Sequence, residues 1–233
     1  MGCCSSKEVN GAASRTSRWR STGIVGLRDS KLKTIPNDVL DLERAVRTLD
    51  LTHNKIVDIP LEISKLVNVQ RLILADNLIQ NLPLNLGRLQ SLKILVLDGN
   101  RITAMPDELG LLIRLERLSI SGNLLSCLPE TIGSLRSLQL LNVSNNKLKF
   151  LPESIGSCFS LEELQADGNS IDALPLSICS LIHLKSLSLN HNNVNQMEGF
   201  QEFESRRKKK FDKQIDANVM INSAGLDEGL DLR

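Results

Sequence analysis

Aliphatic residues recur along most of this chain at one fixed spacing, with polar residues between them. The repeating unit is 23 residues long and has the consensus LxxLxLxxNxLxxLPxxLGxLxx. A period of this length indicates a repeat architecture in which each unit adds one layer to a stack. The leucine, asparagine and proline columns of the pattern are Leu49, Leu72, Leu95, Leu118, Leu141, Leu164 and Leu187; Asn54, Asn77, Asn100, Asn123, Asn146, Asn169 and Asn192; and Pro60, Pro83, Pro106, Pro129, Pro152 and Pro175.

The LxL part of the unit predicts a short strand, because apolar residues alternate there with period two and share one buried face. Strands one repeat apart then stack into a continuous parallel sheet. The proline that follows is compatible with an extended segment or a short 3₁₀ turn, but not with the interior of a long helix. It therefore predicts a short return to the next strand. Each unit buries its faces only against its neighbours, so stability is a property of the stack.

The asparagine column falls where the chain leaves each strand and turns. The side-chain amide of asparagine carries two N–H donors and one carbonyl acceptor. Backbone groups buried between neighbouring repeats need hydrogen-bond partners. We therefore expect the seven asparagines to form a structural ladder that satisfies the backbone groups of the turns.

The pattern divides the chain into four segments. Residues 1–22 are polar and are expected to be a flexible leader. Residues 23–197 are expected to form the solenoid, with one degenerate capping repeat, six complete repeats and one half repeat. Residues 198–220 are predicted to form a basic capping helix, and residues 221–233 a disordered tail. The loss of phase after Gln196 suggests a shortened isoform that lacks about one repeat.

Composition narrows the possible functions. The 233 residues carry a formal net charge of +1, which does not favour a general nucleic-acid binder. The five cysteines include no CxxC pair, so the sequence predicts neither a zinc site nor a disulfide framework. Cys158 falls where other repeats carry leucine, and it is therefore predicted to be a small core residue.

The motifs of common enzyme classes are not found in the sequence. It contains no phosphate loop, no G-x-S-x-G and no H-E-x-x-H. We therefore expect no catalytic residues, no metal or cofactor, no small-molecule substrate and no enzyme activity. An apolar run of about 18 residues and a secretory signal are also missing, which favours a reducing, intracellular compartment.

The amino terminus carries a lipidation motif. Residues Met1 to Ser6 match M-G-x-x-x-[ST], so Gly2 is a candidate for myristoylation, and the adjacent Cys3 and Cys4 are candidates for palmitoylation. One myristoyl chain binds a membrane only marginally, and the two thiols with nearby basic residues supply a second signal. The alternative is an unmodified polar leader. Acylation predicts peripheral attachment to the cytosolic face of the plasma membrane.

A basic run from Arg206 to Lys210 lies within the expected capping helix. It is either the solvated face of that helix or a patch used for nuclear localisation or lipid contact. If the amino terminus is acylated, lipid contact is the better of the two functional interpretations.

The residues on either side of the central position of each LxL point to the exposed face of the predicted sheet. Most are polar, but Ile73, Ile94 and Val96 are apolar and fall on adjacent strands. An exposed apolar cluster with a charged rim is typical of a protein-binding site, whereas the alternative is that β-branched residues merely suit strands. We predict a partner-binding site formed by Ile73, Ile94, Val96, Arg71, Arg117, Leu140 and Asp98.

The 23-residue unit with its LP turn resembles that of the intracellular Ras-group class of leucine-rich-repeat proteins over residues 24–196. The stretch TGIVGLRDSKLKTIPNDVLDLERAVRTLDLTHNKI and the tail RRKKKFDKQID are similar to plant proteins that combine leucine-rich repeats with a ubiquitin-like domain. The layout is also similar to that of leucine-rich-repeat-containing protein 57. The resemblance implies an α/β solenoid, a curved horseshoe with a parallel sheet on its concave face and short helical or 3₁₀ returns on its convex face.

Two functions from different classes follow. The first is a non-enzymatic adaptor or scaffold in intracellular signalling that binds a protein on its concave face and is tethered to a membrane. Family analogy suggests a small GTPase or a kinase as that partner. The second is a partner-recognition module in ubiquitin-linked protein turnover, which the ubiquitin-linked relatives imply. The lipidation motif and the missing ubiquitin-like segment favour the first.

Overall fold

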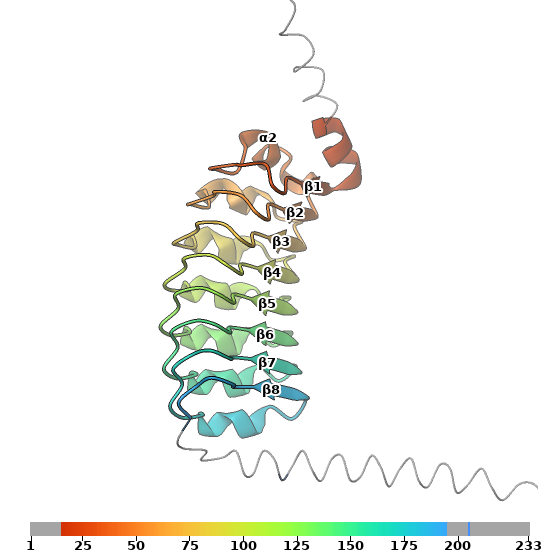
Figure 1. The fold of residues 1–233 in the computed structure, drawn as a ribbon. Coiled ribbons are helices and arrows are strands. Elements are labelled where there is room, and N and C mark those ends of the chain that lie inside the picture. Colours follow the sequence, from red (N-terminus) through yellow and green to blue (C-terminus); the bar gives the residue numbers. More distant parts are fainter. Residues whose placement is uncertain (1–14, 195–204, 206–233) are drawn as a thin grey trace, which may run out of the picture.

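The computed structural model describes residues 15–194 and residue 205. One side of the molecule is an open, eight-stranded parallel sheet, ordered β1 to β8 along the chain (Figure 1). Short 3₁₀ helices form the opposite side, and the layers stack almost straight in this view rather than in a pronounced horseshoe. The predicted parallel solenoid is confirmed. The strands are β1 (Ile24–Gly26), β2 (Thr48–Asp50), β3 (Arg71–Ile73), β4 (Ile94–Val96), β5 (Arg117–Ser119), β6 (Leu140–Asn142), β7 (Glu163–Gln165) and β8 (Ser186–Ser188).

The predicted 3₁₀ returns also recur with the repeat. Each of η2 to η7 begins directly after a proline whose φ lies between −67° and −72° and whose ψ is extended. The pyrrolidine ring therefore stays outside the helix, where its missing N–H costs nothing. These helices are η2 (Leu61–Lys65), η3 (Leu84–Arg88), η4 (Asp107–Leu111), η5 (Glu130–Ser134), η6 (Glu153–Ser157) and η7 (Leu176–Ser180).

The first return differs from the others. It consists of α2 (Asn37–Leu40) followed by η1 (Glu43–Ala45) instead of a single five-residue 3₁₀ helix. The register pairs Val25 with Leu49, which are 24 residues apart, so this return holds the extra residue of the degenerate repeat. The atypical first repeat thus keeps its strand in phase by changing its return.

The core is a continuous column of aliphatic side chains between the sheet and the 3₁₀ helices. The central residue of every strand from β1 to β7 is fully buried. Cys158 is buried among these residues, as predicted, and burial raises the pKa of its thiol to about 12. Close packing of successive 3₁₀ helices is possible because glycine recurs there: a Cβ on Gly133 would lie 2.5 Å from the carbonyl oxygen of Ser154.

Residues 15–22 form a helix at the N-terminal end of the stack (Figure 1), whereas the sequence predicted a flexible leader there. Trp19 is only 9% exposed and belongs to the core. The guanidinium of Arg15 lies 5.9 Å from the centroid of its ring. The N–H of Gly23, which has a φ of +70°, donates to the carbonyl of Trp19. The difference arises because one aromatic side chain packs on the first repeat, in a segment whose other residues are mostly polar.

Other predicted segments cannot be compared with the structure. The leader before residue 15 lies outside the described residues. The capping helix over residues 198–220, apart from residue 205, and the tail over residues 221–233 also lie outside them.

Candidate protein-binding face

The outward-facing side of the sheet, here called the strand face, consists of two rows of residues that flank the buried centre of each strand. Parallel register places residues 23 apart in the sequence beside one another. The first row is Ile24, Thr48, Arg71, Ile94, Arg117, Leu140, Glu163 and Ser186, and the second row is Gly26, Asp50, Ile73, Val96, Ser119, Asn142, Gln165 and Ser188.

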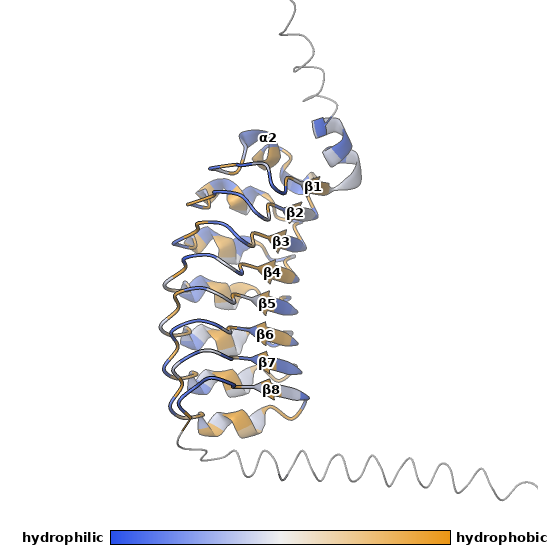
Figure 2. Ribbon diagram, viewed as in Figure 1, coloured by the Kyte–Doolittle hydropathy of each residue, from blue (hydrophilic) through white to orange (hydrophobic). Residues whose placement is uncertain are grey.

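The structure brings Ile73, Ile94 and Val96 together as one apolar cluster. Ile73 and Val96 are register partners on β3 and β4, and Ile94 lies two residues before Val96 on the same face. All three side chains are partly exposed. Leu140 is also partly exposed, but the strand that carries Arg117 separates it from Ile94. Figure 2 shows the apolar band on β4, with more hydrophilic positions on β3 and β5.

The charged residues predicted around this cluster have two different roles. Arg71 and Arg117 are exposed, and neither forms an ion pair with another residue in the described part of the chain. Asp98 is instead occupied within the fold, because its Oδ1 accepts hydrogen bonds from the hydroxyl of Ser119 and the N–H of Ser121, both at 2.7 Å. Asp98 therefore joins two repeats, and the two arginines are the charges that remain available to a partner.

Of the other acidic groups near the N-terminal end of the strand face, Asp50 is partnered within the fold and Asp76 is exposed. Asp50 is buried, and its carboxylate accepts hydrogen bonds from Arg28 at 2.7 Å and from the hydroxyl of Thr52 at 2.6 Å. Burial raises the pKa of Asp50, but the hydrogen bonds from Arg28 and Thr52 outweigh burial and hold that pKa below its usual value. Asp76 follows β3, and one of its carboxylate oxygens lies 3.4 Å from Nε2 of His53, which follows β2.

The asparagine column forms a ladder behind the strand face, and Asn77 shows its geometry. Its Nδ2 donates to the carbonyls of Leu74 and Ala75 in its own turn and of Leu51 in the preceding repeat, at 3.0–3.1 Å. Its Oδ1 accepts from the N–H of Ile56, also in the preceding repeat, at 3.1 Å. Matching bonds to the preceding repeat are made by Asn54, Asn100, Asn123, Asn146, Asn169 and Asn192.

A second structural column, the residue just before each ladder asparagine, was missed in the sequence. Its backbone is left-handed in every repeat, with φ between +53° and +65°. Glycine adopts this region freely, and Asn, Asp and His are enriched among the other residues found there. That restricted set of residue types was the available signal. The column is His53, Asp76, Gly99, Gly122, Asn145, Gly168 and His191.

The described residues show no other candidate functional site that is as well defined as the strand face. They contain no group of three or more side chains placed to hold a metal ion. None of their helices is long and apolar enough to cross a membrane. The lipidation candidates Gly2, Cys3 and Cys4 lie outside the described residues. The strand face is therefore the candidate site within the described residues.

Comparison with protein families and known sequences identifies the repeat. A model of the leucine rich repeat family matches residues 44–102, 90–148 and 114–171, which together span more than half of the chain. Plant intracellular Ras-group-related LRR protein 7 of Oryza sativa subsp. japonica is 60% identical over 74 residues, which are 32% of this chain and 28% of the rice protein. An LRR and ubiquitin-like domain-containing protein of Arabidopsis thaliana is 42% identical over 60 residues, 26% of this chain and 16% of that protein. The chain thus spans less than a third of the curated relatives that it matches.

Solved structures show the same architecture. An LRR protein of Leptospira interrogans has a TM-score of 0.54 and 28% identity, over 78% of this chain and 59% of its own. The plant peptide hormone receptor RGFR1, solved in complex with RGF2, has a TM-score of 0.55 and 28% identity, over 68% of this chain and 30% of its own. Internalin C2 of Listeria monocytogenes has a TM-score of 0.68 at 22% identity, over 79% of this chain and 78% of its own, a likeness of fold alone.

Proposed function

We propose, on the premise that this chain belongs to the leucine-rich-repeat family, that it binds a partner protein on its strand face. Proteins of this family are typically non-enzymatic interaction modules, because a stack of repeats presents one long binding surface. The observation that carries the proposal is the apolar cluster of Ile73, Ile94 and Val96 beside the exposed Arg71 and Arg117. The receptor RGFR1, solved with RGF2 bound, supports a binding role for such repeats.

The cluster is suited to binding because its side chains retain surface that a partner can cover. Burying apolar surface stabilises a complex by roughly 25 cal/mol per Å² before the costs of association. An apolar centre with a polar rim is the usual arrangement of a protein interface. The rest of the strand face is mostly polar, so the cluster defines where on the stack a partner is held.

The test of this site is affinity purification from native cells with wild type beside Ile73→Glu/Val96→Glu. A matched control, Leu84→Glu/Leu111→Glu, adds the same charges at exposed aliphatic positions on the 3₁₀ side. Partners should be lost from the first variant and kept by the second, while circular dichroism shows both folded. Equal recovery by all three proteins contradicts a binding site on the strand face.

A membrane tether is a further part of the proposal. The support is the M-G-x-x-x-[ST] motif at Gly2 with Cys3 and Cys4, and the exposed Arg18 and Arg20 on the N-terminal helix. Acylation there would hold the adaptor at the cytosolic face of the plasma membrane, where a small GTPase or a kinase of a signalling pathway would be its partner. The relatives named for the Ras group support that class of partner by analogy only.

Metabolic labelling with a myristate analogue tests the tether separately from partner binding. Wild type should be labelled and sediment with membranes, whereas Gly2→Ala should be unlabelled and remain in the supernatant. Cys3→Ser/Cys4→Ser should keep the label but sediment less, because one myristoyl chain holds a protein only weakly. An unlabelled wild type contradicts the tether and leaves the strand face unaffected.

Recognition of a partner in ubiquitin-linked turnover is the second candidate function. It is favoured by the similarity to the Arabidopsis thaliana protein with LRR repeats and a ubiquitin-like domain. The same purification separates the two functions. Ubiquitin-ligase subunits that depend on Ile73 and Val96 would favour turnover, and membrane-associated signalling proteins would favour the adaptor.

A further inference from the structure

We propose that the strand face takes an amphipathic α-helix of the partner, lying along the stack, with acidic and apolar residues alternating on its contact side. This inference rests on the proposed protein-binding function and adds the chemistry and shape of the partner. It is carried by three features of the strand face: the sign of its available charge, the order of its residues and the spacing of its strands.

The available charge around the apolar cluster is positive. Arg71 and Arg117 are exposed, and neither forms an ion pair within the described part of the chain. Of the nearby acids, Asp50 and Asp98 already accept hydrogen bonds from the fold itself, and the exposed carboxylate of Asp76 lies 3.4 Å from Nε2 of His53. An approaching partner therefore meets two unpaired guanidinium groups in the first row, and carboxylates are the groups that complement arginine best.

The first row alternates basic and apolar residues over four adjacent strands. Arg71 is the register partner of Ile94, Ile94 of Arg117, and Arg117 of Leu140. The complementary surface must therefore present acidic, apolar, acidic and apolar groups in that order. On the next strand the row continues with the exposed acid Glu163, so the preference for acidic groups ends there.

The spacing of the strands indicates that the partner presents these acidic and apolar side chains from an α-helix and not from an extended chain. Neighbouring strands are about 4.8 Å apart, so the four positions fall at about 0, 4.8, 9.6 and 14.4 Å. Residues i, i+3, i+7 and i+10 of an α-helix lie at about 0, 4.5, 10.5 and 15 Å along its axis. Alternate residues of an extended chain are about 6.7 Å apart and lose this register by the third position.

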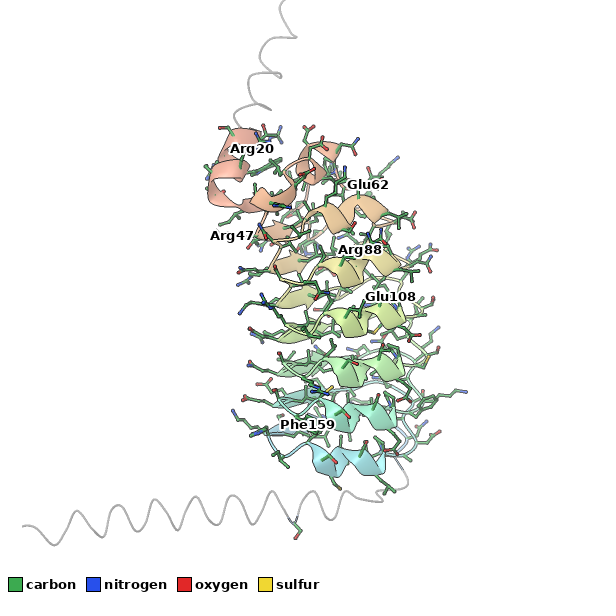
Figure 3. The ribbon with its side chains drawn as sticks, turned by 180° about the vertical axis from the view of Figure 1, so that it is seen from behind. Arg20, Arg47, Glu62, Arg88, Glu108 and Phe159 are labelled. Carbon is green, nitrogen blue, oxygen red and sulfur yellow. The ribbon has the colours of Figure 1, made fainter. Side chains whose placement is uncertain are left out.

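The second row gives this helix a place for its apolar side. Ile73 and Val96 lie beside the first row, toward the N-terminal half of the stack, whereas Ser119 and Asn142 continue the row with polar groups. A helix centred between the rows would cover the apolar cluster and place its acids against the exposed Arg71 and Arg117. Figure 3, seen from behind, shows Arg88 and Glu108 on the 3₁₀ helices, away from this surface.

The experiment uses two displayed peptide libraries selected on the full-length wild-type protein, one on a stapled helical scaffold and one of proline-flanked extended peptides. The helical library should yield the tighter binders, enriched in Asp or Glu at i and i+7 and in aliphatic residues at i+3 and i+10. Their binding should weaken by about tenfold or more with Arg71→Glu/Arg117→Glu. The matched reversal Arg88→Glu/Arg136→Glu on the other side should leave binding unchanged.

A charge swap completes the test. Selected peptides with lysine in place of the two acids should bind the Arg71→Glu/Arg117→Glu protein better than the wild type. Two results would overturn this inference and keep the strand face as the site. In the first, the binders need Ile73 and Val96 but lack acidic residues; in the second, they need Ile73 and Val96 but come only from the extended library. Binders indifferent to Ile73→Glu/Val96→Glu, or no binders at all, count against the proposed site itself.

Discussion

The two ends of the stack bury equivalent residues to different extents. At the N-terminal end, the helix over residues 15–22 places Trp19 on the first repeat, and Val25 of β1 is fully buried. At the other end, Leu187 of β8 occupies the same column as Val25 but is only partly buried. Among the described residues, β8 pairs only with β7. A repeat completes its core only when something covers both of its sides.

The largest effect is expected from truncating the leucine column, and it should depend on position. Leu118→Ala, in the fully buried centre of β5, should cost about 2–5 kcal/mol of unfolding free energy. Leu187→Ala should cost less than half as much, because its side chain is already partly in water. Urea unfolding followed by circular dichroism measures both variants. Equal costs would show that the last described strand is as well covered as the interior.

Removing the N-terminal cap should have the next largest effect. Trp19→Ala should reduce the free energy of unfolding by about 2–3 kcal/mol. This is at or below the cost of truncating a fully buried aromatic side chain, because the Trp19 ring lies at the edge of the core. Hydrogen exchange should show faster opening of β1 and β2 than of β5. Arg18→Ala on the same helix is the control and should leave exchange unchanged, because that side chain is exposed. Uniform exchange in Trp19→Ala would contradict the capping role of the helix.

Removing the side-chain hydrogen bonds of one ladder asparagine in the interior of the stack should reduce the free energy of unfolding by about 1–3 kcal/mol. Asn123→Ala leaves the buried carbonyls of Leu97 and Ile120 and the N–H of Ile102 without their side-chain partner. Asn192→Ala should cost less, because Asn192 is only partly buried and water can replace the amide. Urea midpoints of the two variants give the comparison, and an Asn123→Ala midpoint equal to that of wild type would contradict the ladder's role.

The smallest effect should be the pH dependence contributed by Asp50 near the capped end. Its pKa is lower in the folded chain than in the unfolded chain, so it stabilises the fold at pH values above the unfolded pKa of about 3.9. That stability is lost as the pH falls through the folded pKa. Asp50→Asn and Arg28→Ala should therefore both reduce the drop in urea midpoint between pH 7 and pH 3. An unaltered drop in both variants would show that the pair contributes nothing to stability.

Most of the fold was predictable because its information is local and repeated. The alternation around Leu72 and the proline at position 60 each specify one short element, and the period then places every copy. The helix over residues 15–22 was not predictable in this way. Trp19 is the only buried residue of this helix, and no periodic signal accompanies a single residue.

The candidate site was predictable only in part. Register follows from the period, so the proximity of Ile73, Ile94 and Val96 could be inferred from their spacing. Which charges are available to a partner could not be inferred, because the hydrogen bonds that occupy Asp50 and Asp98 come from residues in neighbouring repeats. A side chain that bonds across the stack looks the same in the sequence as one that is available to a partner.

The asparagine ladder has a consequence for how such a chain can change its length. The bonds of Asn100 reach only its own turn and the repeat before it, ending at Leu74 and Ile79. Gain or loss of one whole 23-residue unit by gene duplication or deletion would therefore reconnect every amide to an equivalent backbone group. An insertion of any other length would have to be absorbed in a return, as the extra residue of the first repeat is, or it would misalign its layer, so length variation should proceed mainly in whole units.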